Sequence, residues 1–327
     1  MKGSDHQNHN QQRKEIHLEQ ASISKETPHF IQHRELYNGA LVSSVLTTSE
    51  KRSLQRPTPQ EENTFLFPNR AYEDKQTHFG FEKVNESEKA KKVYSVFENV
   101  AKSYDTMNDA MSFGIHRIWK DIFIQRLAPS HDTQLLDVAG GTGDIAFRFL
   151  NYLRLSGDHI NASPKVTVCD INKSMLEVGK TRAKRLGLDG PCINWLQDDA
   201  ECLHVEDNSY TAYTIAFGLR NVTRVDKAVK EAHRVLKPGG RFLCLEFSQV
   251  TSPQMRWIYD EYSFKVIPVL GQLIAGQWKP YQYLVESIRQ FPPQEEFRDM
   301  IRSAGFHMVT YENLTFGVVA IHSGFKL

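Results

Sequence analysis

The sequence predicts an α/β protein with a doubly wound, mainly parallel sheet that ends in an antiparallel hairpin. Between residues 133 and 247, short apolar stretches that suit strands alternate with longer stretches whose apolar residues recur every three or four positions. After residue 306, two apolar stretches follow each other with no helix between them. Such a pair is typical of antiparallel strands added to the edge of a parallel sheet.

The alternation predicts each element in order. Strands are expected at 133–139, 165–170, 193–197, 213–218 and 240–247, with helices at 144–155, 174–187 and 224–237. Before them, apolar residues at helical spacing predict helices over 92–127, interrupted near Asn108 and Gly114. After them, a helix is expected at 297–306 and the closing strands at 307–314 and 316–327.

Two regions of different composition divide the chain. Residues 1–76 are polar and show no sustained period, so we expect a disordered N-terminus. This stretch is a candidate targeting region with a weak signal, because residues 1–60 hold eight Lys/Arg against six Asp/Glu. Residues 77–327 then form one domain, in which 253–293 is dense in aromatic residues and proline and is predicted to be a lid-like insertion.

The bulk composition excludes several classes of protein. With 40 basic and 39 acidic residues the formal charge is +1, which argues against nucleic-acid binding and against a polybasic membrane anchor. The four cysteines fall singly and no histidine pair has metal-ligand spacing, so no metal site is predicted. The longest apolar run, within 264–278, is too short and too interrupted to cross a bilayer.

A glycine-rich loop follows the first predicted strand of the alternating region. "LLDVAGGTGDIA" contains Gly141, Gly143 and Ala146 at G-x-G-x-x-A spacing. Glycine permits positive φ and a close approach of the backbone to a ligand, and this serves a nicotinamide cofactor and S-adenosylmethionine (SAM) equally. The pattern alone therefore predicts a nucleotide-like cofactor without choosing between the two.

The charges around this loop favour SAM. Asp137 and Asp144 would oppose a pyrophosphate, whereas SAM carries an ammonium and a sulfonium that tolerate them. Asp170 ends the second strand, where a carboxylate can accept both ribose hydroxyls, and Asp199 and Ala200 follow the third, where adenine would lie. The alternative is that Asp144 is only an acid at a helix N-terminus and Asp170 only a cap.

Five segments together resemble the ubiquinone/menaquinone biosynthesis C-methyltransferase family: "LDVAGGTGD", "CDINKSML", "FGLRNV", "RVLKPGGRFLCLEFS" and "YQYLVESIRQFPPQEEF". The resemblance covers residue 77 to the last leucine. It implies the class I SAM-dependent methyltransferase fold, SAM as cofactor, and C-methylation of a polyprenylated methoxy-benzoquinol in ubiquinone (coenzyme Q) biosynthesis. It also implies a mitochondrial location at the matrix face of the inner membrane, peripheral membrane contact and other subunits of a quinone-biosynthesis complex, and leaves a homodimer open.

The resemblance also implies which residues bind the cofactor. Ala139 stands where the general class I loop has glycine, and Phe316 fills a position usually held by a small residue. The residues carried over to SAM binding are Asp137, Gly140, Gly141, Thr142, Gly143, Asp170, Asp199, Ala200 and Ala216.

The implied chemistry gives Arg220 a role. Methylation at a ring carbon is helped by loss of the neighbouring hydroxyl proton, and a free phenol has a pKa near ~10. A cation about 4 Å from the phenolate contributes ~4 kcal/mol at an effective dielectric of ~20, which corresponds to as many as about three pKa units. Our hypothesis is that Arg220 stabilises the quinolate and Asn221 orients a ring oxygen. The alternative is that Arg220 pairs with Asp109 or Glu246 and braces the loop.

Further candidates lie outside the sheet. Asp109 and His116 are candidate bases, and the alternative for His116 is a structural role beside Trp119. An apolar channel through 256–278 is expected to hold the prenyl tail, with a lid that packs on the sheet as the alternative. The residues expected to contact substrate are Tyr104, Tyr281, Tyr283 and Phe264.

Two other functions stay open at this point. A nicotinamide-dependent oxidoreductase fits the glycine pattern, although Asp137 and Asp144 argue against it. A non-catalytic protein with the SAM-binding fold, acting as a scaffold in a quinone-biosynthesis complex, fits the fold but does not need Asp170 or Arg220.

Overall fold

The structure is a computed structural model, and it describes residues 75–100, 104–156 and 165–327. The polar N-terminus predicted for 1–76 lies almost wholly outside the described residues. The elements described below all belong to the compact unit that Pro57–Leu327 forms.

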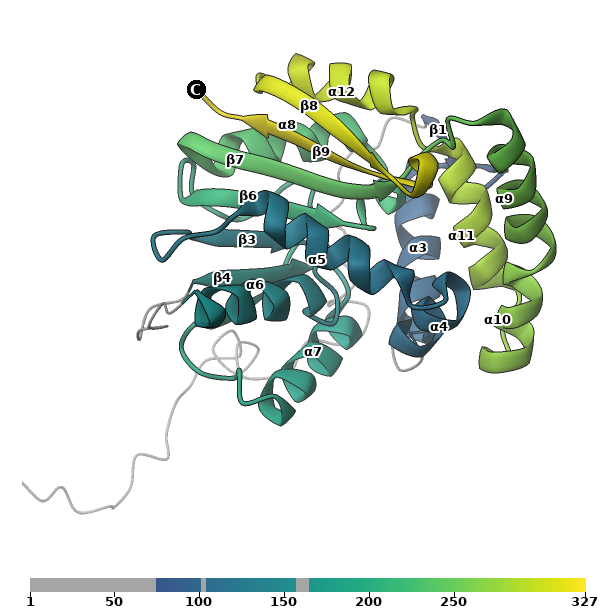
Figure 1. Cartoon of the computed structure of the whole chain (residues 1–327), viewed down its shortest axis with the longest axis horizontal. Coiled ribbons are helices and arrows are strands. Elements are labelled where there is room, and N and C mark those ends of the chain that lie inside the picture. Colours follow the sequence, from purple (N-terminus) through teal and green to yellow (C-terminus); the bar gives the residue numbers. More distant parts are fainter. Residues whose placement is uncertain (1–74, 101–103, 157–164) are drawn as a thin grey trace, which may run out of the picture. The chain divides into compact units, whose positions relative to one another are not determined.

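A seven-stranded mixed sheet forms the centre of this unit, in the order β5-β4-β3-β6-β7-β9-β8 (Figure 1). The first five strands in this order pair in parallel, whereas β9 pairs antiparallel with both β7 and β8. Their bounds are β3 Leu135–Val138, β4 Val166–Asp170, β5 Ile193–Gln197, β6 Tyr210–Ala216, β7 Leu236–Phe247, β8 His307–Leu314 and β9 Val319–Phe325. The predicted fold class is therefore confirmed.

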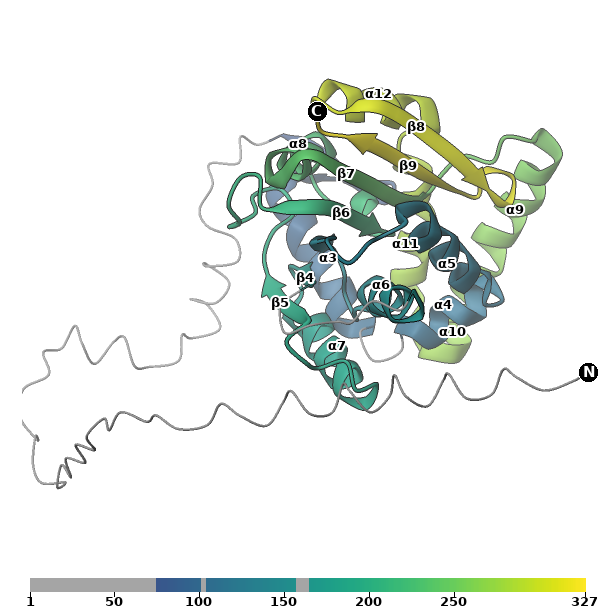
Figure 2. The same cartoon turned by 60° about the vertical axis from the view of Figure 1, so that its left-hand side comes forward.

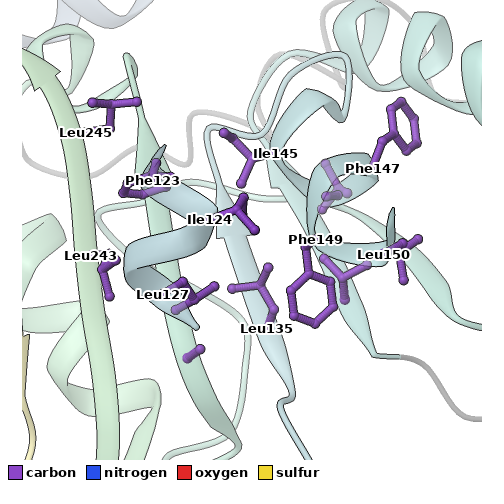
Figure 3. Packing of buried hydrophobic residues seen from close by; sticks show 14 of the residues in the cluster. Phe123, Ile124, Leu127, Leu135, Ile145, Phe147, Phe149, Leu150, Leu243 and Leu245 are labelled. Carbon is purple, nitrogen blue, oxygen red and sulfur yellow. The ribbon is translucent and has the colours of Figure 1, made fainter. Parts of the chain in front are cut away.

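Alternating residues of the strands feed two cores. Leu135 of β3 packs with Phe149 and Leu150 on one face of the sheet, while Leu136 packs with Phe242 and Phe297 on the other. The first face is covered by α5 (Ile115–Leu127), α6 (Asp144–Leu155) and α7 (Lys173–Arg185), and Figure 3 shows part of this core. The second is covered by α8 (Val225–Val235) and α12 (Gln294–Ser303), as in Figure 2.

Helices gather beyond the carboxyl ends of the parallel strands (Figure 1). They are α3 (Glu86–Val100), α4 (Tyr104–Ser112), α9 (Pro253–Lys265), α10 (Ile267–Ala275) and α11 (Lys279–Gln290). α11 contacts the short 3₁₀ turn Leu219–Asn221 that follows β6, so the predicted insertion 253–293 approaches the sheet through its last helix. None of the described helices has both the length and the apolar character that a membrane span requires.

Several boundaries differ from those expected. Asn108 lies inside α4 and does not interrupt a helix, so that prediction is wrong, whereas Gly114 separates α4 from α5 with φ 76° as expected. The sequence reasoning also missed a small hairpin, β1 (Gln76–Phe79) and β2 (Glu82–Asn85). Its strands hold four residues each, too few for a periodic signal to stand out.

Candidate active site

A first pocket lies at the carboxyl ends of the parallel strands β3, β4 and β6 and beside the turn after β5. The edge where strands of an open α/β sheet end is the usual ligand site of this architecture. Residues at or just after the ends of four different strands line it: Ala139 and Gly141, Asp170 and Ile171, Asp199 and Ala200, and Ala216 with Phe217. Tyr94 and Phe97 of α3 close the opposite side.

The glycine loop has the backbone that the sequence predicts. Gly141 and Gly143 have φ values of 53° and 80°, in the left-handed region that favours glycine. Ala139 also has positive φ, 51°, so alanine is strained at the position where the general class I loop has glycine. Gly140 is needed for space, because a Cβ there would lie 2.7 Å from Val168 Cγ1 and 2.9 Å from Asp137 O.

Asp170 holds the loop and faces the pocket. Its Oδ2 accepts from the Gly141 N–H at 2.9 Å and its Oδ1 from the Asn172 N–H at 2.8 Å. The helix cap itself is Asn172, whose side chain accepts from Met175, so Asp170 is not the cap of α7. Burial raises the pKa of Asp170 to about 6, since two backbone hydrogen bonds only partly stabilise the carboxylate. A carboxylate has remaining lone pairs for the two ribose hydroxyls, so this site fits SAM.

We expect the affinity for SAM to fall in mild acid because Asp170 must be ionised to accept both hydroxyls. Below about pH 6, Kd should rise about tenfold per pH unit, since binding then releases a proton. The α-amino and α-carboxyl groups of an amino acid titrate outside pH 5–7. Calorimetric titration with SAM at several pH values measures this. Asp170→Asn keeps one accepting oxygen, so it should bind ten- to a hundredfold more weakly at pH 7.5, about one hydrogen bond to a charged group, and show no such pH dependence.

Two acids of the predicted cofactor site lie elsewhere. Asp137 is fully buried beneath Gly140, accepts from Thr214 Oγ1 at 2.8 Å and does not line the pocket, and burial raises its pKa to about 7. Asp144 is paired with Lys120 at 2.7 Å and with Arg182 and Arg148. Burial raises the pKa of Asp144, but these three cations lower it more. Asp137 and Asp144 are therefore not two free negative charges that face the pocket. The prediction that they would repel a pyrophosphate there is wrong.

The other predicted cofactor residues divide into two groups. Gly141, Asp170, Asp199, Ala200 and Ala216 line the first pocket together. Gly140, Thr142 and Gly143 belong to the glycine loop but do not line the first pocket.

A second pocket adjoins the first. Phe97, Phe217 and Asn221 line both, so the two cavities meet at the end of β6. The walls of the second pocket are mostly aromatic and aliphatic, and its polar groups come from α4, α5, α9, α11 and the turn after β6. They include His116, Lys120, Arg220, Tyr259, Tyr262, Tyr281 and Tyr283.

Arg220 lies in the wall of the second pocket and is paired. Its Nη1 is 2.8 Å from Glu246 Oε1 and also donates to Phe217 O, and both side chains of the pair are buried. Of the two pairings considered for Arg220, the one with Glu246 is therefore present, and Arg220 does not pair with Asp109. Because Glu246 offsets the arginine charge, the estimate of about three pKa units for a lone cation does not hold. The buried Nε of Arg220 has no hydrogen-bond partner among the described residues, so this N–H is an unsatisfied donor in the wall of the second pocket.

His116 and Asp109 form a dyad of which only the histidine reaches the pocket. His116 Nε2 lies 2.9 Å from Asp109 Oδ1, and Asp109 also accepts from Arg117. The hydrogen bonds from Arg117 and His116 hold the pKa of Asp109 well below its usual range, so this carboxylate is a poor base, contrary to prediction. Burial lowers the pKa of His116, and its buried Nδ1 has no partner among the described residues.

The predicted substrate residues are only partly brought together. Tyr281 and Tyr283 line the second pocket, and the Tyr283 hydroxyl donates to Asn221 Oδ1 at 3.1 Å. Phe264 does not line the second pocket; it is 41% exposed with its ring near that of Phe81, so the structure does not bring it together with Tyr281 and Tyr283. Tyr104 begins α4, but its side chain lies outside what the structure describes.

The predicted tail channel through 256–278 is also wrong in its lining. Within this range Ile267 lines the second pocket, whereas Ile258, Leu273 and Ile274 are exposed. Sequence reasoning missed Tyr259 and Tyr262, which do line it. Their spacing of three places both on one face of a helix and was the available signal.

Comparisons with known proteins agree with this arrangement. Residues 84–326 match the model of the ubiE/COQ5 methyltransferase family. The chain is 62% identical over 259 residues to the mitochondrial 2-methoxy-6-polyprenyl-1,4-benzoquinol methylase of Drosophila melanogaster, covering 78% of this chain and 86% of that one. The chain is also 54% identical over 320 residues to the Homo sapiens protein of the same name. The match covers 90% of this chain and 91% of the human protein.

A solved structure supports the fold alone. The [4+2]-cyclase SpnF superposes with a TM-score of 0.50 at 17% identity, covering 72% of this chain and 96% of that one. The family match and the high identity to two relatives confirm the resemblance inferred from the sequence motifs. The chain belongs to the ubiE/COQ5 methyltransferase family.

Proposed function

We propose that this chain uses SAM to methylate a ring carbon of 2-methoxy-6-polyprenyl-1,4-benzoquinol in ubiquinone biosynthesis. The observation that carries the proposal is the junction of two pockets at Phe97, Phe217 and Asn221. One pocket suits the nucleoside of SAM, and the other suits an aromatic ring. A methyl donor in one pocket and a ring in the other meet where these three residues line both, and they are then in position for direct transfer.

The residues of the first pocket bind and orient the cofactor. When bound, SAM supplies an electrophilic methyl group on its sulfonium. Asp170 would accept hydrogen bonds from the ribose hydroxyls, Gly141 would permit close approach, and Asp199 and Ala200 would hold the adenine end. Phe97 and Phe217, at the junction, exclude water from the transfer.

Arg220 and Asn221 position the quinol oxygens. The remaining Nε–H of Arg220 donates to the oxygen that loses its proton, and Glu246 holds the guanidinium in place. An N–H donor that points at a developing oxyanion in a site without water stabilises the transition state. This holds even though Glu246 cancels the charge of Arg220. Asn221 keeps its Nδ2 for a second ring oxygen because Tyr283 occupies its Oδ1; the contact of Nδ2 with Phe217 O is long, 3.5 Å.

His116 is the group that takes the quinol proton. Since the Asp109 carboxylate can only accept, Nε2 of His116 carries the hydrogen and Nδ1 is left as a base. The lowered pKa keeps this histidine neutral at physiological pH. Asp109 positions the ring by fixing its tautomer.

His116→Gln should reduce kcat by about a hundredfold or more, the usual contribution of a general base, with Kd for SAM unchanged. In the wild type, kcat should fall on acidification with a midpoint below pH 6.5, because protonation of a histidine with a lowered pKa removes the base. Asp109→Asn should lower kcat while leaving the imidazole in place. A kcat profile from pH 5 to 8 for all three proteins tests this, and an unchanged acidic limb in His116→Gln would exclude His116.

The relatives' names place them in mitochondria, and this chain is assigned there on that basis. We further propose the matrix face of the inner membrane, with peripheral membrane contact and association with other subunits of a quinone-biosynthesis complex. The support is the substrate, whose prenyl tail keeps it in a membrane. The segment 253–293 acts as a lid, since its helices line the second pocket.

Family membership disfavours both rival functions, the nicotinamide-dependent oxidoreductase and the non-catalytic scaffold. A methyl-transfer assay tests the proposal directly. The purified chain is incubated with methyl-labelled SAM and the demethylated benzoquinol or naphthoquinol, each reduced and oxidised. We expect label on a ring carbon of the reduced benzoquinol. Label in neither quinol would defeat the assignment.

A further inference from the structure

The turn after β6 carries Asn221 and has a strained backbone. Phe217, at its start, has φ 57°, a left-handed value that a bulky residue rarely adopts. A Cβ on Gly218 would lie 2.4 Å from Ala139 Cβ, so the turn lies directly against the glycine loop. A backbone of this kind keeps its geometry only where neighbouring groups hold it. The contacts around the turn therefore decide where Asn221 lies.

Side chains of α3 and α11 hold this turn. The buried Lys89 of α3 donates from Nζ to Val222 O at 3.0 Å. From α11, the Tyr283 hydroxyl donates to Asn221 Oδ1 at 3.1 Å, and burial raises the pKa of this hydroxyl well above its usual range, so it stays a donor. At the other end of the amide, Phe217 O can only accept, and it lies 3.5 Å from Asn221 Nδ2. Both neighbours favour one orientation of the amide, with Oδ1 toward Tyr283.

The β1–β2 hairpin, in turn, contacts α11 and fixes the position of Tyr283. The rings of Phe79 and Tyr283 are stacked, with centroids 4.2 Å apart and an interplanar angle of 15°. Three residues further along α11, Glu286 Oε2 accepts from the Phe81 N–H at 3.0 Å. A Cβ on Gly80 would lie 2.3 Å from the same oxygen, so the hairpin turn approaches α11 closely. The hairpin thus holds α11 at two positions on one face of the helix.

The orientation of the Asn221 amide has a chemical consequence. Asn221 lines both pockets, at the place where the methyl donor and the ring meet in the proposed function. An N–H that faces a ring oxygen stabilises this oxygen as it loses its proton. An amide oxygen in the same place would accept from the neutral hydroxyl and would oppose its ionisation.

We propose that Tyr283 and Phe79 are positioning residues for the methyl transfer. The hydroxyl of Tyr283 keeps the Asn221 amide with Nδ2 toward the quinol oxygen, and the stacked ring of Phe79 keeps Tyr283 in place. The proposal rests on the proposed function and deepens it, since it gives the β1–β2 hairpin a part in the reaction although the hairpin lines neither pocket.

Turnover of a short-chain benzoquinol by the full chain tests this pair. The proteins compared are the wild type, Tyr283→Phe, Phe79→Leu and the double variant, with Phe79→Tyr as the conservative change that keeps a stacked ring. Two matched controls make the same changes elsewhere. Tyr311→Phe removes a hydroxyl that donates to Glu295 at 2.6 Å outside both pockets, and Phe81→Leu removes a ring from the same hairpin that lines neither pocket.

We expect Tyr283→Phe to lower kcat about three- to tenfold, the effect of one hydrogen bond, with Kd for SAM unchanged. Phe79→Leu should lower kcat by no more than this, and it should have no further effect once the Tyr283 hydroxyl is gone. Phe79→Tyr should recover the wild-type kcat, and both controls should keep it. A wild-type kcat in Tyr283→Phe would overturn the proposal. So would losses that multiply in the double variant, because Phe79 would then act independently of the hydroxyl.

A coloured probe separates this proposal from the proposed function. The phenolate of 2-methoxy-4-nitrophenol absorbs visible light, so ionisation of the bound phenol is measured without any methyl transfer. In the presence of S-adenosylhomocysteine, its ionisation constant should be about three- to tenfold larger on the wild type than on Tyr283→Phe. If the wild type methylates no quinol, the proposed function fails while the probe still decides the positioning. Equal ionisation constants on the two proteins, or a wild type that does not bind the probe, would then overturn it as well.

Discussion

Arg220→Met lowers the free energy of unfolding by about 3–5 kcal/mol, because Glu246 is then buried without its cationic partner. Glu246→Gln has a similar effect, since it leaves the arginine uncompensated. The double variant Arg220→Met/Glu246→Gln recovers most of the lost stability, because a buried ion pair replaced by neutral groups is often close to neutral. The glutamine oxygen can still accept from one of the two backbone N–H groups, of Arg220 or of Phe247, that the two carboxylate oxygens of Glu246 accept from. Denaturant unfolding of the four proteins measures these differences.

The double variant also separates bracing from catalysis. If Arg220 donates to the quinol oxygen, the refolded and stable double variant still has kcat reduced by about 10²–10³, the usual effect of removing one such donor. Its Kd for SAM stays near that of the wild type, because Arg220 lines the second pocket and not the first. A stable double variant whose kcat lies within a few-fold of the wild type would leave Arg220 with only its structural role.

Gly140→Ala reduces the affinity for SAM at least tenfold and destabilises the protein by about 1–3 kcal/mol. The new Cβ would lie 2.7 Å from Val168 Cγ1 and 2.9 Å from both Asp137 O and Asp137 Oδ2. The loop must move to relieve these contacts, and Gly141 moves with it away from Asp170. Calorimetry with SAM and thermal unfolding measure the two effects.

The neighbouring residue provides the matched control. Ala139→Gly relieves a left-handed alanine, which costs about 1–2 kcal/mol, but it also makes the unfolded chain more flexible by roughly 0.4–1 kcal/mol. The net change in stability is therefore small and favourable, with SAM affinity retained. Equal losses from Gly140→Ala and Ala139→Gly would contradict the contacts assigned to this loop.

The sheet and the cofactor end of the site follow from local patterns. Each strand is visible in the sequence as a short apolar run, and parallel strands bring the residues after them to one edge. The strand pattern alone therefore groups Gly141, Asp170, Asp199 and Ala216, and these four residues line one pocket.

Contacts between distant side chains could not be predicted in this way. Lys120 of α5 and Arg182 of α7 neutralise Asp144, and neither is near it in sequence. The pairing of Arg220 with Glu246 was one of two options, because the sequence does not show whether Glu246 or Asp109 packs against the turn after β6. A choice between them requires the packed strands β6 and β7.

The residues that line the second pocket were harder to predict from the sequence, because α10 is apolar on nearly all of its faces. A helix of this kind gives no amphipathic signal for its inward face. Ile267 faces the second pocket and Leu273 faces out, a difference that composition does not show. The prediction of a channel through 256–278 consequently mixed residues of both faces.

The central claim is that the methyl donor and the quinol ring meet where the two pockets join. The most direct test is a crystal structure of the chain with S-adenosylhomocysteine and a short-chain benzoquinol. We expect the sulfur and the accepting ring carbon to lie next to each other beside Asn221, with the gap between them filled by one methyl group, the ribose on Asp170 and a quinol oxygen at Arg220 Nε. A quinol bound outside the second pocket, or one separated from the sulfur by Phe97 or Phe217, would contradict the claim.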